Sequence, residues 1–224
     1  MTTKLSLFNS ALLLCGQRSL ASLSEEVEAR RLLDHVWDEE DGVSYCLEQG
    51  QWFFAMRTIL IDYDPSIEPE YGYRRAFVKP SDWVLTSALC ADEFFREPLT
   101  QYVDEAGYWY SDLDEFYVRY VSSDASYGKD LNKWPESFRE YVSAYFASKI
   151  ILKLSGDKSN SLLALFNPDK PKNSIVEKAL LVAKSRCAMA MPTSFAARGS
   201  WSSSRMSGAA RRDRSNSSSG SLIG

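Results

Sequence analysis

The side chains of this chain that could act as acids, bases or nucleophiles are mainly carboxylates. A glycoside hydrolase needs two carboxylates held on either side of a sugar-binding cleft, and closeness in sequence does not supply that geometry. The chain has 30 acidic residues, so we expect its acidic runs to be solvated faces rather than catalytic pairs. There are three such runs: Asp38, Glu39, Glu40 and Asp41; Asp62 and Asp64; and Asp112, Asp114 and Glu115.

Other reactive side chains form no recognisable constellation. His35 is the only histidine, and Cys15, Cys46, Cys90 and Cys187 are scattered without a Cys-x-x-Cys motif or a Cys/His cluster. Neither a zinc site nor a redox motif is therefore expected, and the thiols should be free and buried. The sequence also lacks the glycine patterns of phosphate-binding loops and hydrolase nucleophile elbows,. It predicts no enzyme activity, no cofactor and no metal site.

Aromatic residues between 99 and 121 could stack on sugars or fill a core. Tyr102, Tyr108 and Trp109 surround the stretch "DEAG" (104–107), which predicts a hairpin with glycine at its turn,. Residues 116–121 alternate as a third strand would. Because aromatic side chains are favoured in strands and usually pack inside, we favour the core over sugar binding.

The last segment, residues 192–224, differs in composition from the rest of the chain. It is rich in Ser, Gly and Ala and carries five arginines against one aspartate, a net charge of +4, so the remainder carries −8 of the overall −4. Such a segment cannot bury enough apolar surface to order itself, and we expect it to act as an arm that folds on a partner. Its candidate docking residues are Phe195, Arg198, Trp201, Arg205, Met206, Arg211, Arg212, Arg214, Leu222 and Ile223.

These groups would be positioned by helices on either side of a β region. Apolar spacing predicts an amphipathic core helix at 5–15 rather than an export signal, and a second helix from Ser24 to about Leu47. Pro135 begins a dense apolar helix that runs to Gly156, and two more helices follow at 158–167 and 174–191. No stretch approaches the roughly twenty apolar residues of a membrane span.

The order of elements predicts an α+β fold that is mainly α. We expect a helical bundle (αα…ααα) with a small antiparallel β region inserted and an extended C-terminal tail. The bundle domain would comprise residues 1–57 and 134–191, the inserted β/loop domain 58–133, and the Ser/Gly/Arg-rich arm 192–224.

Four stretches, taken in order, resemble the head-to-tail adaptors of short-tailed phages, the tail tubular protein A family. They are "LFNSALLLCGQRSLASLSEEVEARRLLDHVWDE" (7–39), "CLEQGQWFFAMR" (46–57), "YVDEAGYWY" (102–110) and "KWPESFREYVSAYFASKI" (133–150). Each motif alone is weak, but their order and spacing cover most of residues 5–190.

The resemblance implies a structural virion protein and no catalysis. Copies of the chain would form a ring, usually a dodecamer, between the portal protein and the tail nozzle (tail tubular) protein. Genomic DNA would pass through its lumen during ejection, and a C-terminal extension would embrace the portal. The protein would be made in the host cytoplasm and reside in the tail of the virion.

The residues fit this resemblance physically. A rigid helical body can close a ring through heterologous contacts. An acidic body repels phosphates, so a lumen lined by carboxylates would let DNA slide. The tail's Ser/Arg richness has no residue-by-residue match in the family, so its docking role rests on position and composition.

Two other functions compete with the adaptor. One is a virion-associated polysaccharide-degrading hydrolase, which would need two carboxylates about 5–10 Å apart in an aromatic-walled cleft. The other is a packaging factor whose arginine arm binds nucleic acid with a steep salt dependence. The adaptor leads because it explains the whole order of elements, whereas each competitor explains one patch.

Overall fold

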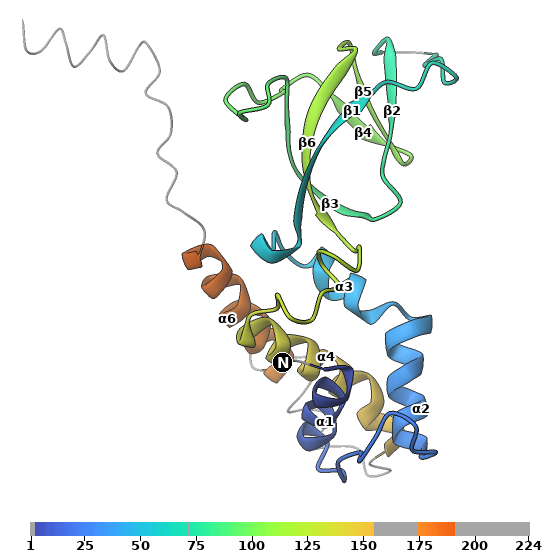
Figure 1. Ribbon diagram of the computed structural model, residues 1–224, viewed down its shortest axis with the longest axis vertical. Coiled ribbons are helices and arrows are strands. Elements are labelled where there is room, and N and C mark those ends of the chain that lie inside the picture. The colour runs from blue at the N-terminus through green and yellow to red at the C-terminus, as the bar shows by residue number, and fades with distance from the viewer. Residues whose placement is uncertain (1–2, 71, 155–173, 191–224) are drawn as a thin grey trace, which may run out of the picture. The chain divides into compact units, whose positions relative to one another are not determined.

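Helices precede and follow a β region along the chain (Figure 1). The structure, a computed structural model, describes residues 3–70, 72–154 and 174–190. The helices are α1 (Lys4–Leu14), α2 (Glu28–Asp34), α3 (Gly42–Glu48), α4 (Glu136–Leu154) and α6 (Ile175–Ala190), with a π-helical turn η1 (His35–Glu39) and a 3₁₀ turn η2 (Phe53–Ala55). The strands are β1 (Met56–Asp62), β2 (Arg75–Val78), β3 (Trp83–Cys90), β4 (Val103–Glu105), β5 (Tyr108–Ser111) and β6 (Glu115–Ser122).

The expectation of a mainly α-helical bundle is wrong. Of the described residues, 40% are helical, with five α-helices, and 21% lie in strands that form two small antiparallel sheets. This is a mixed fold. The strands β1, β2 and β3 occupy residues 56–90, most of which the sequence assigns to the inserted β/loop domain without predicting the individual strands. They form because β1 and β3 both pair with β6, and such distant pairing leaves no local pattern,.

The first helix forms as predicted. Thr3 and Ser6 close a capping box at its start, and Leu7, Phe8, Ala11 and Leu12 are buried along one face,. The helix ends at Cys15, and Gly16 follows with a φ of +66°, the left-handed conformation that glycine adopts without strain,.

The second predicted helix is shorter and broken. Ser24 does not cap it, since Ser22 and Ser24 bond to each other and the helix begins after Val27, at Glu28. After the π-helical turn, Asp41 adopts a φ of +43° and ends the run before α3 begins. A non-glycine residue in this region is uncommon, and the sequence gives no sign of it.

The two sheets have the strand orders β1-β6-β3 and β2-β5-β4. The predicted hairpin is confirmed: β4 and β5 pair across Ala106 and Gly107, which both have positive φ values (+49° and +86°). A two-residue turn of this kind matches the twist of the flanking strands. The predicted third strand is also present, as β6, but it pairs with β1 and β3 rather than with the hairpin.

Two hydrophobic clusters hold the described residues together. The larger cluster joins the helices and includes Phe8, Trp52, Phe138 and Phe146, with Val121 of β6 packed into it. The smaller lies between the strands and consists of Phe77, Leu89, Trp109, Phe116, Val118 and Tyr120. Residues 1–190 belong to one compact unit. The division at residues 57/58 and 133/134 stays a prediction.

The predicted helices after Pro135 are confirmed where the structure describes them. Phe138 donates its N–H to the Pro135 carbonyl at 3.1 Å, and α4 buries side chains on most of its circumference. Ser174 accepts from the N–H of Glu177 at 3.2 Å and caps α6,. The predicted helix at 158–167 and the arm 192–224 lie outside the described residues.

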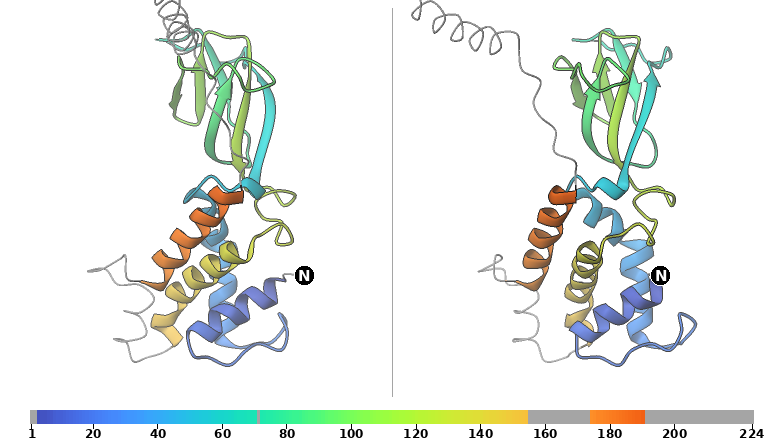
Figure 2. Two further views of the ribbon diagram at one scale, coloured as in Figure 1. Left: turned by 90° about the vertical axis from the view of Figure 1, so that its left-hand side faces the viewer. Right: turned by 60° about the vertical axis from the view of Figure 1, so that its left-hand side comes forward.

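Helices α6 and α2 both pack on α4. Figures 1 and 2 show them on opposite sides of it, with α1 crossing a third side. Within the described part of the chain, the structure has no helix that combines the length and the apolar character needed to cross a membrane.

Candidate functional site

The predicted docking residues of the arm cannot be located. Phe195, Arg198, Trp201 and the other candidates up to Ile223 all lie outside the described residues. The candidate sites below are formed by residues of the described ranges, 3–70, 72–154 and 174–190.

Three carboxylates of the first acidic run pair with lysines from other elements, and the fourth, Glu39, contacts His35 within the π-helical turn. Lys4 of α1 lies 3.5 Å from Asp38, and the π-helical turn brings Glu39 2.7 Å from His35. Hydrogen bonding to Glu40 raises the pKa of Lys149, so this lysine stays charged. The remaining ion pairs of the run are Lys149 with Glu40 and Lys129 with Asp41, each at 3.0 Å. These carboxylates join α1, α4 and the 129 loop to the second helical segment, which is a structural role.

The carboxylates of the other two acidic runs bond within a turn or join segments that are distant in the sequence. Asp64 accepts from the N–H and hydroxyl of Ser66, and Asp112 accepts from the N–H of Arg74 at 3.0 Å. Asp114 forms a 2.7 Å ion pair with Arg75. Asp62 and Glu115, the remaining members of these runs, are cross-strand partners in the register of β1 with β6.

The aromatic residues of the β region fill its core, as expected. Trp109, Phe116 and Tyr120 are fully buried, and Trp109 packs edge-on against Trp83 with 6.4 Å between ring centroids. The face of Trp83 is covered by the ammonium of Lys79, 3.6 Å from the ring centroid. Burial and this cation–π contact occupy the faces that a sugar would need.

The β region contains two polar networks that the sequence did not predict. Asp82, with 14% of its side chain exposed, receives hydrogen bonds from Arg57, Tyr120 and Ser122. Burial raises the pKa of Asp82, but these hydrogen bonds outweigh burial and hold the pKa below its usual value,. In the second network, Asp104 of β4 accepts from Lys79, from the indole N–H of Trp109 and, at 3.4 Å, from the hydroxyl of Thr86, which links the hairpin to β3.

The four thiols are free and buried, as predicted. Burial raises the pKa of Cys15 to about 11, so the thiol stays protonated and unreactive,. In the described ranges, no three His, Cys, Asp or Glu side chains are grouped closely enough to hold a metal ion.

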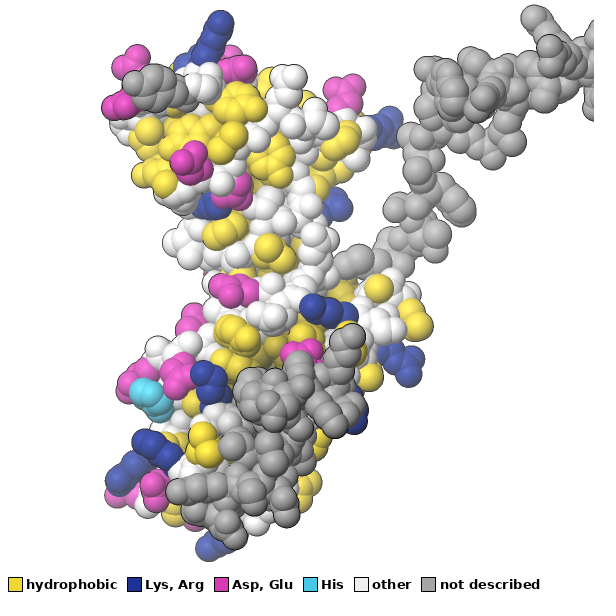
Figure 3. Space-filling model, turned by 180° about the vertical axis from the view of Figure 1, so that it is seen from behind, with side chains coloured by type: hydrophobic (Ala, Val, Ile, Leu, Met, Phe, Trp, Pro, Cys, Tyr) yellow, Lys and Arg dark blue, Asp and Glu magenta, His cyan; other side chains and the backbone are white. Residues whose placement is uncertain are grey.

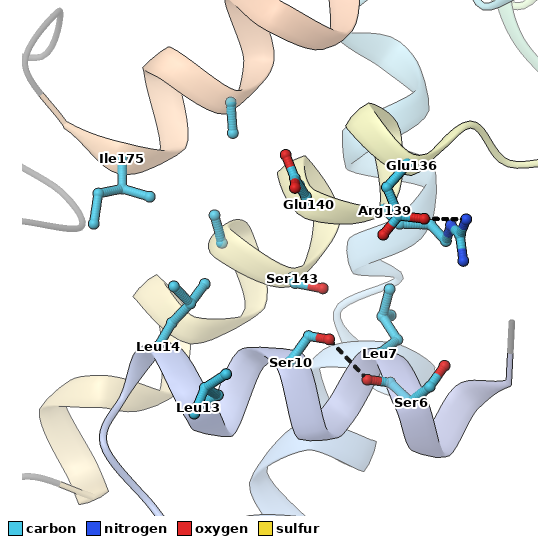
Figure 4. Close-up of a pocket in the computed structure, with 12 residues that line it drawn as sticks. Ser6, Leu7, Ser10, Leu13, Leu14, Glu136, Arg139, Glu140, Ser143 and Ile175 are labelled. Atoms are coloured by element: carbon cyan, nitrogen blue, oxygen red, sulfur yellow. Dashed lines mark hydrogen bonds and ion pairs between the residues drawn. The ribbon is translucent and has the colours of Figure 1, made fainter.

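A groove of about 420 Å³ lies between α1, α4 and α6 (Figure 4). Figure 4 shows an apolar end formed by Leu13, Leu14 and Ile175, and a charged end with Glu136, Arg139 and Glu140. Leu13 has 75% of its surface exposed, an unusual state for a leucine on a core helix. An apolar end beside a charged end suits contact with another protein segment.

Beside this groove, α6 presents a second apolar surface. Its buried stripe consists of Val176, Leu180, Ala183 and Cys187, which face α4. On the outward side, Leu181 is 57% exposed and Met189 74% exposed, with the half-exposed Val182 between them. The outward side of α6 therefore exposes large apolar side chains among charged ones, which is typical of an interaction surface.

The sequence carried a signal for this surface. Residues 175–190 are apolar in almost every direction around the helix axis, and only one stripe is needed to pack on α4. The groove could not be predicted in this way, because α1 and α6 meet across α4 only in the folded chain.

Comparisons with known proteins add no assignment. No family model matches the chain, and the curated proteins contain no significant match to its sequence. The likeness to head-to-tail adaptors therefore rests on the four sequence stretches alone.

Proposed function

We propose that the chain is a structural virion protein, a head-to-tail adaptor that forms a ring between the portal and the tail nozzle of a short-tailed phage. Genomic DNA passes through this ring, and the arm 192–224 docks on the portal. The protein acts by binding, and no catalytic step belongs to this function.

The observation that carries this function is the exposed apolar surface of the helical elements. Leu13 on α1 and Leu181 and Met189 on α6 are more than half exposed, although all three lie on helices whose other faces form the main core. Exposing such side chains to water is unfavourable by roughly 25 cal/mol per Å². A surface of this kind favours a protein that works in an assembly.

The stretches that resemble the adaptor family have defined structural roles here. Asn9, in the first stretch, bonds through its amide to both the carbonyl and the N–H of Leu20. Trp52, in the second, donates to the carbonyls of Cys46 and Leu47 at 3.2 and 3.0 Å. Because Asn9 and Trp52 fix backbone turns, their presence in the stretches that resemble the adaptor family supports a similar architecture.

The charge division supports the roles assigned to body and arm. The body carries net −8 and the arm +4. An acidic ring would let DNA slide through its lumen, and the arginines of the arm would pair with carboxylates on the portal. Because many arms act together in a ring, weak individual contacts add up to strong docking.

Co-sedimentation with purified portal rings tests this function. The full chain should sediment with the portal, and a chain lacking residues 192–224 should lose most of that binding. A variant with Arg211, Arg212 and Arg214 changed to alanine should bind less tightly than the full chain. A full chain that stays in the supernatant would refute the adaptor, whereas a truncated chain that binds normally would refute only the role of the arm.

A further inference from the structure

The loop between β3 and β4 is held closed by its own hydrogen bonds. The carboxylate of Asp92 accepts from the N–H groups of Arg96 and Glu97, at 3.0 and 2.8 Å. At the base of the loop, Ala91 donates its N–H to the Glu97 carbonyl at 3.1 Å. Because the bonds to Asp92 favour its ionised form, they hold the pKa of this carboxyl below its usual value, and the loop stays closed at neutral pH,.

The backbone of this loop is strained at Phe95, whose φ is +55°. For a bulky residue this left-handed conformation is an outlier, which persists only where the surrounding structure holds it in place. The guanidinium of Arg119 on β6 lies 4.3 Å from the centroid of the Phe95 ring and fixes the ring on the sheet. The preceding residue, Phe94, has 67% of its surface exposed. A strained and pinned loop that presents a phenylalanine to solvent is typical of a binding site.

Arg96 completes the exposed part of the loop. Its guanidinium lies 5.2 Å from the centroid of the Phe94 ring, so the two side chains form one surface. Arg96 is exposed and forms no ion pair with any residue that the structure describes. Aromatic residues and arginine are both enriched in protein interfaces. We call Phe94 and Arg96 the knob.

The sheet β2-β5-β4 carries a pocket of about 460 Å³. Its apolar and aromatic walls include Val103, Tyr73 and Tyr110, of which Val103 and Tyr110 are cross-strand partners. Glu70 and Glu105 line the same pocket, are exposed and have no ion-pair partner among the described residues. In Figure 3, apolar and acidic side chains lie together at the left edge of the β region. The lining contains no lysine or arginine, so the pocket suits an apolar group that lies beside a cation.

The knob and the pocket lie on opposite faces of the β region. The two sheets pack on each other through Trp109 of β5 and Phe116 of β6, whose ring centroids are 6.2 Å apart. Because side chains alternate along a strand, Tyr110 on one sheet and Arg119 on the other both point away from this core,. Tyr110 lines the pocket, and Arg119 holds the loop that carries the knob. A contact between two such faces joins copies head to tail.

We infer that the knob of one copy inserts into the pocket of a second copy of this chain. Phe94 would be covered by the two tyrosines and the valine of the pocket, and Arg96 would pair with Glu70 or Glu105. A symmetric contact of knob against knob would instead bring two arginines together and leave both pockets open. The contact deepens the proposed function, on which it rests, by assigning a pair of surfaces through which neighbouring copies in the ring touch.

The charges that flank this contact have mixed signs. Glu93 and Glu97 are exposed beside the knob, and Arg74 is exposed beside the pocket. Burial of the Phe94 ring therefore supplies most of the affinity, whereas the ion pair of Arg96 fixes the orientation.

Substitutions in the knob of the full chain test the contact. F94A removes the apolar anchor, and R96E places a carboxylate against Glu70 and Glu105. Assembly, measured by sedimentation velocity with and without portal rings, should require about tenfold more protein for F94A and severalfold more for R96E. The controls F53A and R31E change a partly exposed phenylalanine and an exposed arginine of the helical elements. Both controls should assemble like wild type.

An exchange of charge provides the stronger test. E70R/E105R should assemble poorly, because its pocket repels Arg96. In an equimolar mixture of this variant with R96E, each knob meets a pocket of opposite charge on the other variant, so assembly should recover nearly to the wild-type level. Circular dichroism would verify that every variant is folded.

The outcomes separate this contact from the proposed function. If wild type assembles and F94A does so at the same protein concentration, or if the mixture fails to recover, the knob contact is wrong and the adaptor stands. If wild type remains monomeric both alone and with portal rings, both are wrong.

Discussion

Single side chains fix the backbone where the helical elements turn. Asn9 lies on the side of α1, and its amide donates to the Leu20 carbonyl at 3.1 Å and accepts from the Leu20 N–H at 2.7 Å. The backbone N–H and carbonyl of Leu20, which lies outside any helix or strand, thus both have hydrogen-bond partners. The Leu20 side chain is held in the core,. Asn9 therefore fixes one point of the connection between α1 and α2, which Glu25 also holds by accepting from the N–H of Ala21 at 2.9 Å.

Replacing Asn9 with alanine should lower the free energy of unfolding by about 1–3 kcal/mol, because two part-buried hydrogen bonds are lost and the Leu20 backbone is left unsatisfied. Urea denaturation measures this change. Ser10→Ala is the matched control: its hydroxyl only bonds back to the Ser6 carbonyl on an exposed helix face, so its effect should be within about 0.5 kcal/mol. Equal effects of the two substitutions would contradict the role of Asn9.

In the β region, Asp82 likewise connects separate segments through hydrogen bonds of its side chain. Its carboxylate accepts from Arg57 at 2.9 Å and from Tyr120 at 3.1 Å. Asp82→Asn should cost about 1–3 kcal/mol, because the substitution leaves these donors with a poorer acceptor. Asp114→Asn breaks an ion pair whose carboxylate is 75% exposed and should cost only about 0–1 kcal/mol. If Asp82→Asn lowered the free energy of unfolding less than Asp114→Asn did, the Asp82 network would not be a source of stability.

The Asp82 network should also depend on pH. Because the pKa of Asp82 in the folded state lies below the ordinary 3.8, the unfolded chain binds a proton more readily at acidic pH. The stability advantage of wild type over Asp82→Asn should thus be constant near neutral pH and decline as the pH falls below about 4. Urea titrations at several pH values measure it, and an advantage that grows with acidity would have the wrong sign.

At the scale of elements, the sequence predicted those helix ends and turns that are set by interactions between neighbouring residues. The ends of α1, the hairpin turn and the start of α4 follow from Gly16, Gly107 and Pro135, each of which acts on its immediate neighbours. The early break of the second helix, at Asp41, and the pairing of β6 with β1 and β3 depend on distant contacts. The mixed fold was missed because of such pairings.

One position in the turn of the β4–β5 hairpin, Ala106, could be substituted to raise the stability of the protein. Ala106 adopts a φ of +49°, which costs a residue with a Cβ about 1–2 kcal/mol. Since asparagine tolerates this conformation and favours the first position of such turns, Ala106→Asn should raise the free energy of unfolding by about 0.5–1 kcal/mol. Thermal unfolding would reveal it as a higher melting temperature. Gly107→Ala, at a φ of +86°, should act in the opposite direction, and a stabilising Gly107→Ala would show that the turn is assigned incorrectly.

The candidate site was only partly accessible from sequence. Composition separated the arm from the body, whereas the exposed apolar side of α6 was not predicted. The partners of the acidic run at 38–41, Lys4, Lys129 and Lys149, come from three distant segments that only the fold brings together.

At the scale of the whole molecule, charge division is the organising feature. The body carries net −8 and the arm 192–224 net +4, so an assembly that brings carboxylates against these arginines should weaken with salt. Raising the ionic strength from about 0.05 to 0.5 M shortens the screening length from roughly 14 to 4 Å, and the protein concentration needed for assembly should rise severalfold. Sedimentation velocity across this range measures the effect. Assembly that is indifferent to salt would indicate a purely apolar contact.

Electron microscopy of the wild-type chain mixed with purified portal rings is the most direct test of the adaptor. We expect closed rings of this chain, seated coaxially on the portal and leaving an open central channel. Portal rings without added density, or chain bound as scattered single copies, would contradict the adaptor function.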